Sequence, residues 1–385
     1  PCTESENPAE YILEAIGAGV HGKSNVDWPA AWRDSPERTS ITAELAEIQR
    51  TAPTIYTSDE NGPAREFSTS IWYQTMEVYK HLNLIWWRDP FYTFGSFVQS
   101  ILCALILAFT FYDLKNSSSD MEQRMFLIFE ALILGILVIY VCLPQFLIQK
   151  EYFKRDYASK FYSWFPFAIS IVIVEIPYTI ISGSLFFFII YWTCGIDSTG
   201  ENGFYFWIMF MMMLLFMCSF GQAVGAVCVN MFLAFTIVPL LIIFLFLFCG
   251  VMVPYQSIPY FWRSWIYHLN PATYIMEGLI TSVLKNVDIT CETKDLIPFT
   301  APDGYTCDQY NAIGNFTTNN MGNIHTFDDG SCGYCTYKSG TEYFENVLSW
   351  DSGHRWRNFG VLTGFWVFNI FMVIGFVYLS KRAKR

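Results

Sequence analysis

Long runs of apolar residues, broken by short polar segments, dominate the chain after its first 90 residues. Residues 202–262 contain no Asp, Glu, Lys or Arg. A bilayer span needs roughly 20 apolar residues, because about 30 Å of hydrocarbon is crossed at about 1.5 Å per residue. This run is therefore long enough for two spans joined by a tight hairpin, and it predicts an integral membrane protein.

The same pattern predicts six spans, which cover residues 91–112, 125–148, 161–192, 204–228, 231–253 and 359–379. The third stretch is too long for one perpendicular helix, so Pro166 and Pro177 are expected to divide it into an elbow and a span. The segment 258–284 is aromatic and is broken by prolines. We expect it to form two short helices that dip into the outer leaflet, and not a seventh span.

The polar segments before the first span predict two further elements. Residues 1–63 form a polar region with one short helical stretch near residues 40–50. Residues 64–88 place larger side chains at helical spacing, namely Trp72, Met76, Tyr79, Asn83 and Trp87. This spacing predicts an amphipathic helix that lies along the inner membrane surface. A soluble docking helix is the alternative.

Basic residues orient the spans. Lys and Arg are enriched in cytoplasmic loops. The loop 149–160 carries Lys150, Lys154, Arg155 and Lys160, and the tail 381–385 carries four more basic residues. Both segments lie on one side under a six-span count, so both termini are expected to be cytoplasmic and the long loop 254–357 external.

The loop 254–357 carries two features that suit an external location. It holds four cysteines in polar sequence, Cys291, Cys307, Cys332 and Cys335, which suggest two disulfides in an oxidising compartment. Cys332 and Cys335 are too close in sequence to bond each other easily, so each is expected to pair with Cys291 or Cys307, in an order left open. The loop also holds a glycosylation sequon at Asn315. His325 and His354 lack zinc-ligand spacing, and we predict no metal site.

Composition narrows the class of protein further. The chain is 53% hydrophobic and 15% charged, against about 25% charged residues in ordinary soluble domains. Its net charge is −11, without a basic stripe, which argues against nucleic acid as a partner. The polar N-terminal residues do not resemble a signal peptide, and we expect the chain to be a fragment of a longer protein. The six cysteines in or beside the spans are expected to pack as small apolar side chains.

One motif match is rejected. Residues 17–24 read Gly-Ala-Gly-Val-His-Gly-Lys-Ser, which fits the phosphate-loop pattern that ends here in Lys23 and Ser24. A working phosphate loop needs a buried strand before it and a helix directly after it. Residues 8–16 are more typical of a short capped helix, and Pro29 follows too soon for a helix that opens at Ser24. We predict no cofactor-binding residue and no catalytic residue in this chain.

A few polar side chains inside the spans are candidates for the path of a transported molecule. Glu130 and Glu175 are ionisable residues within predicted membrane spans, where such residues usually face a cavity or a partner. Gly221 and Gly225 form a G-x-x-x-G pair that favours close helix packing. Their neighbours Ser219 and Gln222 are expected either to pack with them or to line a polar stretch of the path.

Several strings resemble the second membrane half of a pleiotropic drug resistance transporter, in the G subfamily of ATP-binding cassette (ABC) proteins, most of all the fungal-type members. The strings begin at Asn7 (Asn-Pro-Ala-Glu-Tyr-Ile-Leu-Glu-Ala-Ile-Gly), Glu66 (Glu-Phe-Ser-Thr-Ser-Ile-Trp-Tyr), Trp87 (Trp-Arg-Asp-Pro), Tyr162 (Tyr-Ser-Trp), Glu175 (Glu-Ile-Pro-Tyr), Gly250 (Gly-Val-Met-Val-Pro-Tyr), Leu269 (Leu-Asn-Pro-Ala-Thr-Tyr), Cys332 (Cys-Gly-Tyr-Cys) and Arg355 (Arg-Trp-Arg-Asn-Phe). They occur in order over essentially the whole chain.

The resemblance implies an all-α membrane protein of the ABC-2, type V exporter kind. Residues 1–63 would be a cytoplasmic linker, 64–88 a connecting helix, 89–380 a six-span domain with a disulfide-containing external loop at 254–357, and 381–385 a basic cytoplasmic tail. The nucleotide-binding domains, with ATP and Mg²⁺, would lie outside this chain, which carries no ATPase site of its own.

The resemblance also implies roles for single residues. Val251 and Met252 are candidates for an apolar plug in the path, with plain helix-end packing as the alternative. Lys154, Arg155 and Asp156 are candidates for contact with an ATP-binding domain, besides serving as a positive-inside anchor.

The expected function is ATP-driven export of amphipathic xenobiotics or lipids by alternating access, in a multi-pass protein of the plasma membrane. Expected partners are the lipid bilayer, nucleotide-binding domains, a second transmembrane half and the amphipathic substrate. The alternative is a membrane-anchored receptor or adhesion protein with a disulfide-tied external domain.

Overall fold

The computed structural model describes residues 7–17, 24–51, 66–196, 200–300, 306–307, 309, 322–327 and 331–382. The chain divides into two units, Pro1–Glu66 and Phe67–Arg385. The first unit holds α1 (Pro8–Ala15), α2 (Trp28–Arg33) and α3 (Pro36–Thr51). In α1 the side chain of Asn7 accepts a hydrogen bond from the backbone N–H of Ala9, which caps the helix. A capped helix therefore precedes the phosphate-loop-like string, as predicted, and among the described residues the next helix begins at Trp28.

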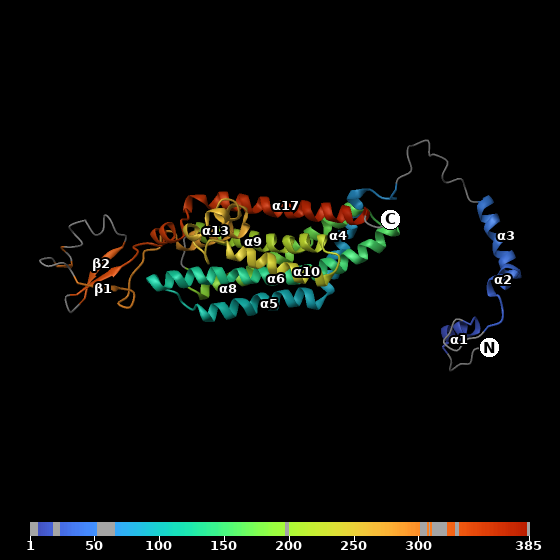
Figure 1. The fold of residues 1–385 in the computed structure, drawn as a ribbon, viewed down its shortest axis with the longest axis horizontal. Coiled ribbons are helices and arrows are strands. Elements are labelled where there is room, and N and C mark those ends of the chain that lie inside the picture. Colours follow the sequence, from blue (N-terminus) through green and yellow to red (C-terminus); the bar gives the residue numbers. More distant parts are fainter. Residues whose placement is uncertain are drawn as a thin grey trace, which may run out of the picture. The chain divides into compact units, whose positions relative to one another are not determined.

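The second unit is a helical bundle (Figure 1). Its long helices are α4 (Ile71–Arg88), α5 (Pro90–Thr110), α6 (Ser118–Ala158), α8 (Glu175–Thr193), α9 (Gly200–Val227), α10 (Met231–Leu247) and α17 (Arg355–Arg382), with the shorter α7 (Trp164–Ile173) leading into α8. Within the described residues, five helical stretches are long and apolar enough to cross a membrane, counting α7 and α8 as one, and α10 is a shorter apolar helix of 17 residues. The prediction of a multi-pass, mostly helical membrane protein is confirmed.

The bundle has two distinct ends (Figure 1). A small β-sheet lies beyond one of them, which we call the sheet end. The α6–α7 turn and the end of α17 lie at the other, which we call the basic end because the basic residues of the 149–160 segment gather there.

One boundary of the second span differs from that predicted, whereas the predicted division of the third stretch is found. Residues 149–158 are not a loop, because α6 continues without interruption to Ala158, and charged side chains are compatible with a helix that extends past the apolar region. The stretch 161–192 divides at Val174, where α7 ends and α8 begins. Pro177 explains this position, since its ring lacks an N–H and clashes with the carbonyl four residues earlier, at Ile173.

The end of α10 also lies earlier than predicted, at Leu247 instead of residue 253. The side chain of Asn270 donates to the carbonyl of Leu245 at 2.7 Å, and the hydroxyl of Thr273 donates to the carbonyl of Phe248 at 3.1 Å. These bonds satisfy backbone acceptors that the helix end leaves without partners. Gly250 follows at a φ of 90°, in the left-handed region that glycine adopts at low cost.

The aromatic segment after α10 was only partly predicted. It contains η1 (Tyr255–Ser257), the short helices α11 (Tyr260–Arg263) and α12 (Ile266–Leu269), and a longer helix, α13 (Pro271–Leu284). The expectation of two short helices alone is wrong, because α13 is buried along nearly its whole length and packs against α9 and α17.

The sheet before α17 is small and cross-linked. Its strands are β1 (Ile297–Phe299), β2 (Asn323–Thr326) and β3 (Cys332–Cys335), in the order β1-β3-β2, with both pairs antiparallel. Disulfides join Cys291 to Cys335 and Cys307 to Cys332. Each cysteine of the C-x-x-C pair thus bonds an upstream cysteine, as predicted, and the structure supplies the order. The helices α16 (Gly340–Tyr343), η2 (Phe344–Leu348) and η3 (Ser352–His354) lead from the sheet to α17.

The centre of the bundle is the contact between α6 and α9. A Cβ on Gly221 would lie 3.2 Å from Ile139, and one on Gly225 would lie 2.9 Å from the ring of Phe146. The G-x-x-x-G pair therefore serves close packing of α9 on α6, the role expected for it.

Candidate functional site

The carboxylate of Glu175 is the meeting point of three helices. Glu175 is the first residue of α8, and the break at Val174 turns its side chain into the bundle, where only 2% of the residue is exposed. Its Oε1 accepts a hydrogen bond from the indole Nε1 of Trp86 in α4, at 3.2 Å. Its Oε2 accepts a hydrogen bond from the hydroxyl of Tyr92 in α5. A buried carboxylate is costly without donors, so these bonds fix α4 and α5 against α8.

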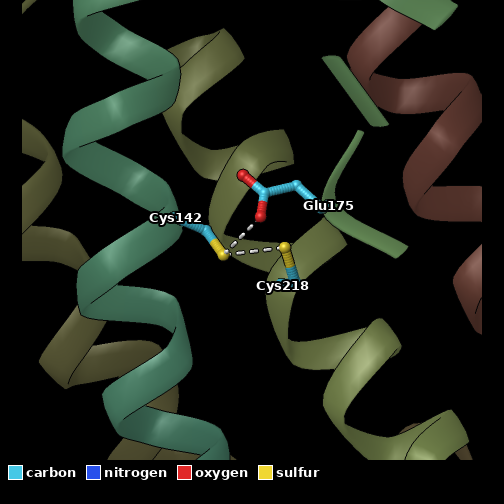
Figure 2. Close-up of side chains that lie close together, drawn as sticks. All are labelled: Cys142, Glu175 and Cys218. Atoms are coloured by element: carbon cyan, nitrogen blue, oxygen red, sulfur yellow. Dashed lines mark hydrogen bonds between the residues drawn. The ribbon is translucent and has the colours of Figure 1, made fainter. Parts of the chain in front are cut away.

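Two thiols extend this arrangement to two more helices. The Sγ of Cys142 in α6 donates to Oε2 of Glu175 at 3.6 Å, and the Sγ of Cys218 in α9 lies 2.8 Å from that of Cys142 (Figure 2). We call these five residues, Trp86, Tyr92, Cys142, Glu175 and Cys218, the Glu175 cluster. It joins α4, α5, α6, α8 and α9 at one buried point.

Besides the Trp86–Glu175 bond, α4 forms further hydrogen bonds to the neighbouring helices. The side chain of Gln74 accepts from the backbone N–H of Ser163 at 2.9 Å, and the hydroxyl of Ser170 donates to the carbonyl of Thr75 at 3.1 Å. Near the other end, the hydroxyl of Tyr178 donates to Oδ1 of Asn83 at 3.1 Å. A shift of α4 along its axis would break these bonds together.

The buried face of α4 is not the one that carries Trp72 and Trp87. Gln74, Val78, Leu82 and Trp86 are buried, at a spacing of four residues. Trp72 and Trp87, from the stripe identified in the sequence, are 76% and 69% exposed. Trp72, Met76 and Trp87 of the stripe are thus exposed, whereas Tyr79 packs against the core and Asn83 bonds to Tyr178.

Ser219 and Gln222 bond to neighbouring helices. The hydroxyl of Ser219 accepts from Nδ2 of Asn369 in α17 at 3.1 Å. The Nε2 of Gln222 donates to the carbonyl of Ile171 in α7 at 3.0 Å. Both residues are buried, and each ties α9 to a different helix.

The remaining path candidates lie in dissimilar surroundings. Val251 is 9% exposed and belongs to the apolar core, whereas Met252 beside it is 59% exposed. Glu130 is half-buried in α6, and among the described residues no hydrogen bond or ion pair is found for it. The predicted glycosylation residue, Asn315, lies outside the described residues.

The predicted coupling residues occupy the last turns of α6, at the basic end. Lys154 pairs with Glu151, and the guanidinium of Arg155 lies over the ring of Tyr152 at 5.6 Å. Asp156 accepts from the hydroxyl of Tyr162 at 3.3 Å, and burial, followed by the Asp156 charge, raises the pKa of that tyrosine. Arg155 and Asp156 border a cleft of about 650 Å³, whose other wall is the face of α4 around Gln74 and Glu77.

A second polar site, at the sheet end, was not found from the sequence. Glu277 of α13 is only 6% exposed, and its carboxylate lies 3.4 Å from Nδ1 of His354 and 3.5 Å from the guanidinium of Arg357. These residues line a pocket of about 340 Å³ with Tyr267 and Trp350. Burial raises the pKa of Tyr267 to about 12. The only sign of this site in the sequence was the pair of arginines in the string that begins at Arg355.

Comparisons with known proteins agree with this architecture. The ABC-2 type transporter family matches residues 73–284, which is more than half of the chain, and the CDR ABC transporter family matches residues 330–385. Over its full length the chain is 60% identical to ABC transporter G family member 11 and 58% identical to ABC transporter G family member 21, both from Dictyostelium discoideum.

A fungal relative is more distant. The chain is 33% identical, over 99% of its length, to the ABC multidrug transporter atrF of Aspergillus flavus. It covers 27% of each of the two Dictyostelium proteins and 25% of the Aspergillus protein, so it spans about a quarter of the length of these curated relatives. Taken with the helical bundle and the disulfide-bonded sheet before its last helix, these matches show that the chain belongs to the ABC-2 type transporter family and is a membrane domain of the G-family, pleiotropic drug resistance type.

Proposed function

We propose that this chain is the C-terminal transmembrane half of an exporter that moves amphipathic xenobiotics or lipids out of the cell by alternating access. The observation that carries the proposal is the bond between Trp86 and Glu175. Through it, a helix that precedes the spans is attached at the buried centre of the bundle. A push on α4 from outside the chain would then act directly on α5, α6, α8 and α9.

The push would come from nucleotide-binding domains that bind ATP and Mg²⁺ elsewhere in the full protein. The cleft between α4 and the end of α6 offers such a domain both a cavity and charged groups, Arg155 and Asp156. Lys154 would stand beside them as a third contact. A second membrane half, in the same polypeptide or in a dimer, would complete the path.

The orientation follows from charge and from the disulfides. Basic residues gather at the basic end, which we place in the cytoplasm together with both termini. The disulfides Cys291–Cys335 and Cys307–Cys332 suit an oxidising compartment, and this supports an external location of the sheet end at a plasma membrane.

The substrate would be held mainly by apolar contact, which tolerates varied shapes. Met252, exposed and flexible, would stand at a constriction with Val251. Glu130 would offer one charge to a cationic substrate within the path. A multidrug transporter is among the relatives, at 33% identity, and this supports the xenobiotic class of substrate.

The test uses the full-length protein in inside-out membrane vesicles. A fluorescent amphipathic cation, a sterol and a phospholipid are each offered with ATP and with a non-hydrolysable analogue. We expect ATP-dependent accumulation of at least one of the three, and its loss when both Arg155 and Asp156 are changed to Ala. Absence of ATP-dependent movement for all three compounds would overturn the proposal. Saturable binding of a soluble ligand to the outside of cells that express the protein would then support the receptor alternative.

A further inference from the structure

The Glu175 cluster contains two thiols that the proposed transport function does not use. The Sγ atoms of Cys142 and Cys218 and a carboxylate oxygen of Glu175 all lie within 4.8 Å of one another, and all three residues are buried (Figure 2). Among the described residues, no other three side chains of metal-ligating type converge in this way. We propose that Cys142, Cys218 and Glu175 form a binding site for a thiophilic divalent cation of the zinc class.

The geometry needs only a small adjustment to admit such an ion. Zinc binds cysteine sulfur at about 2.3 Å and carboxylate oxygen at about 2.0–2.2 Å, with tetrahedral angles. Two sulfur ligands of one tetrahedral ion therefore lie roughly 3.8 Å apart. The two sulfur atoms are 2.8 Å apart, so they must separate by about 1 Å, which a change of side-chain rotamer on α6 or α9 supplies.

The ligand types select the class of ion. Thiolates favour soft or borderline cations such as Zn²⁺ and Cd²⁺ over Mg²⁺ and Ca²⁺, which prefer all-oxygen sites. Binding would release the protons of both thiols. The resulting site has two thiolates and one carboxylate around a dication, so it carries one net negative charge.

Groups around the ligands suit a metal centre. Trp86 and Tyr92 donate hydrogen bonds to Glu175, and such outer donors orient a ligating carboxylate and spread its charge. A cavity of about 20 Å³ lies beside Cys142 and is lined in part by Ser96, Gln99 and Ser100. That volume accommodates one water molecule, which would serve as a fourth ligand in polar surroundings.

This site could not be recognised from the sequence. Cys142 and Glu175 are 33 residues apart, Cys142 and Cys218 are 76 apart, and the three residues come from three different helices. No short motif exists, and the prediction of no metal site rested on the external histidines alone.

A bound ion would tie α6, α8 and α9 together at one point. This consequence rests on the proposed function, because it matters only if those helices move relative to each other during transport. The cation would then slow transport reversibly, and a chelator would restore it.

The test is a titration of the full-length, metal-free protein with Cd²⁺, under a reductant that is not itself a thiol. The ultraviolet charge-transfer band of cadmium thiolate reports the binding. We expect Cys142→Ser and Cys218→Ser each to weaken one Cd²⁺ site at least about 100-fold, and Glu175→Gln to weaken it about 10-fold or more. The control is Cys194→Ser, which removes another fully buried thiol outside the cluster and should leave the titration unchanged.

A second measurement needs no variant. Zn²⁺ or Cd²⁺ should protect Cys142 and Cys218 from alkylation in wild-type membranes, as read by mass spectrometry of the labelled peptides, and should not protect Cys194. Equal labelling with and without the cation would overturn the site. So would a Cys142–Cys218 disulfide in the protein as isolated, or a cadmium site retained by the double Cys→Ser variant.

Failure of the metal site and failure of the transport proposal are distinguishable. The titration and the alkylation assay require no transport, so a negative result there leaves the proposed function intact. A metal-free protein that moves no substrate would overturn the proposed function and leave the binding result standing.

Discussion

The ammonium group of Lys150 lies 2.8 Å from the carbonyl oxygen of Ala226, at the C-terminal end of α9. It also donates to the carbonyls of Gly225 and Cys228, at 3.1 and 3.0 Å. The last carbonyls of a helix lack intrahelical partners and carry the negative end of its dipole. One cation on α6 thus satisfies the end of a largely buried helix.

Replacing Lys150 should destabilise the bundle. We expect Lys150→Met to cost about 2–3 kcal/mol, because three buried carbonyls lose a charge-assisted donor. The midpoint of thermal unfolding of the full-length protein in detergent should fall. Lys154→Met is the matched control, since Lys154 pairs only with the exposed Glu151, and such a pair is worth less than about 1 kcal/mol. Equal shifts for the two variants would contradict this view of Lys150.

Removing the indole N–H of Trp86 should loosen α4. Trp86→Phe leaves Glu175 with one donor fewer, at a cost of about 1–2 kcal/mol, which corresponds to roughly 5- to 30-fold faster local opening. Hydrogen exchange of the α4 amides, followed by mass spectrometry, measures this directly. Trp87→Phe, at the neighbouring exposed position, should leave the exchange unchanged. Faster exchange in both variants would indicate a general effect of losing an indole ring.

Adding one methyl group at Gly225 should disturb the α6–α9 contact. A Cβ there would lie 2.9 Å from Phe146 and 3.0 Å from Leu143, and both side chains are fully buried. Overpacking of this kind costs about 1–3 kcal/mol. The midpoint of thermal unfolding of the Gly225→Ala protein should therefore fall.

Gly364→Ala in α17 is the comparison for this variant, because nothing lies within 4 Å of its added Cβ. It should keep or slightly raise the midpoint, since alanine favours a helix over glycine by about 1 kcal/mol. A Gly225→Ala protein as stable as the wild type would argue against tight packing at this contact.

The two disulfides should be detectable separately, and they close loops of different lengths. Cys307–Cys332 closes a loop of 25 residues and Cys291–Cys335 one of 44, and each should stabilise its segment by about 2–4 kcal/mol. Non-reducing peptide mapping should recover these two pairs and no others among the four cysteines. Cys307→Ser should make residues 290–340 more sensitive to protease, while cleavage within α3 is unchanged. Recovery of a Cys332–Cys335 pair would contradict the structure.

The spans were predictable because apolar length alone identifies a membrane helix. What the sequence could not supply was the identity of the partners inside the bundle. Glu175 was recognised as an unusual intramembrane charge, yet its donors lie on helices that only the fold brings near it. Lys150 was counted only among the basic residues of a cytoplasmic loop, because a basic residue in a predicted loop offers no sign that it reaches a neighbouring helix.

The helix α4 also shows what the sequence could not predict. The stripe predicted through Trp72 and Trp87 leaves both of these side chains exposed, while the face from Gln74 to Trp86 is buried. Hydrophobic periodicity identified the helix and its end, although the helix begins at Ile71 and not at residue 64. It could not decide which of two partly apolar faces meets the protein, because a membrane protein has apolar surroundings on both sides.

The side chain of Asn270 holds two helices at once. Its Oδ1 accepts from the backbone N–H of Ala272 at the start of α13, while its Nδ2 donates to the carbonyl of Leu245 near the end of α10. The junction between α10 and α13 is therefore held by hydrogen bonds and does not act as a free hinge. A tilt imposed on α10 from the basic end would therefore act on α13 through this side chain, and α13 carries Glu277 of the sheet-end pocket. A conformational signal would thus reach the far side of the membrane without passing through the loop that joins the two helices.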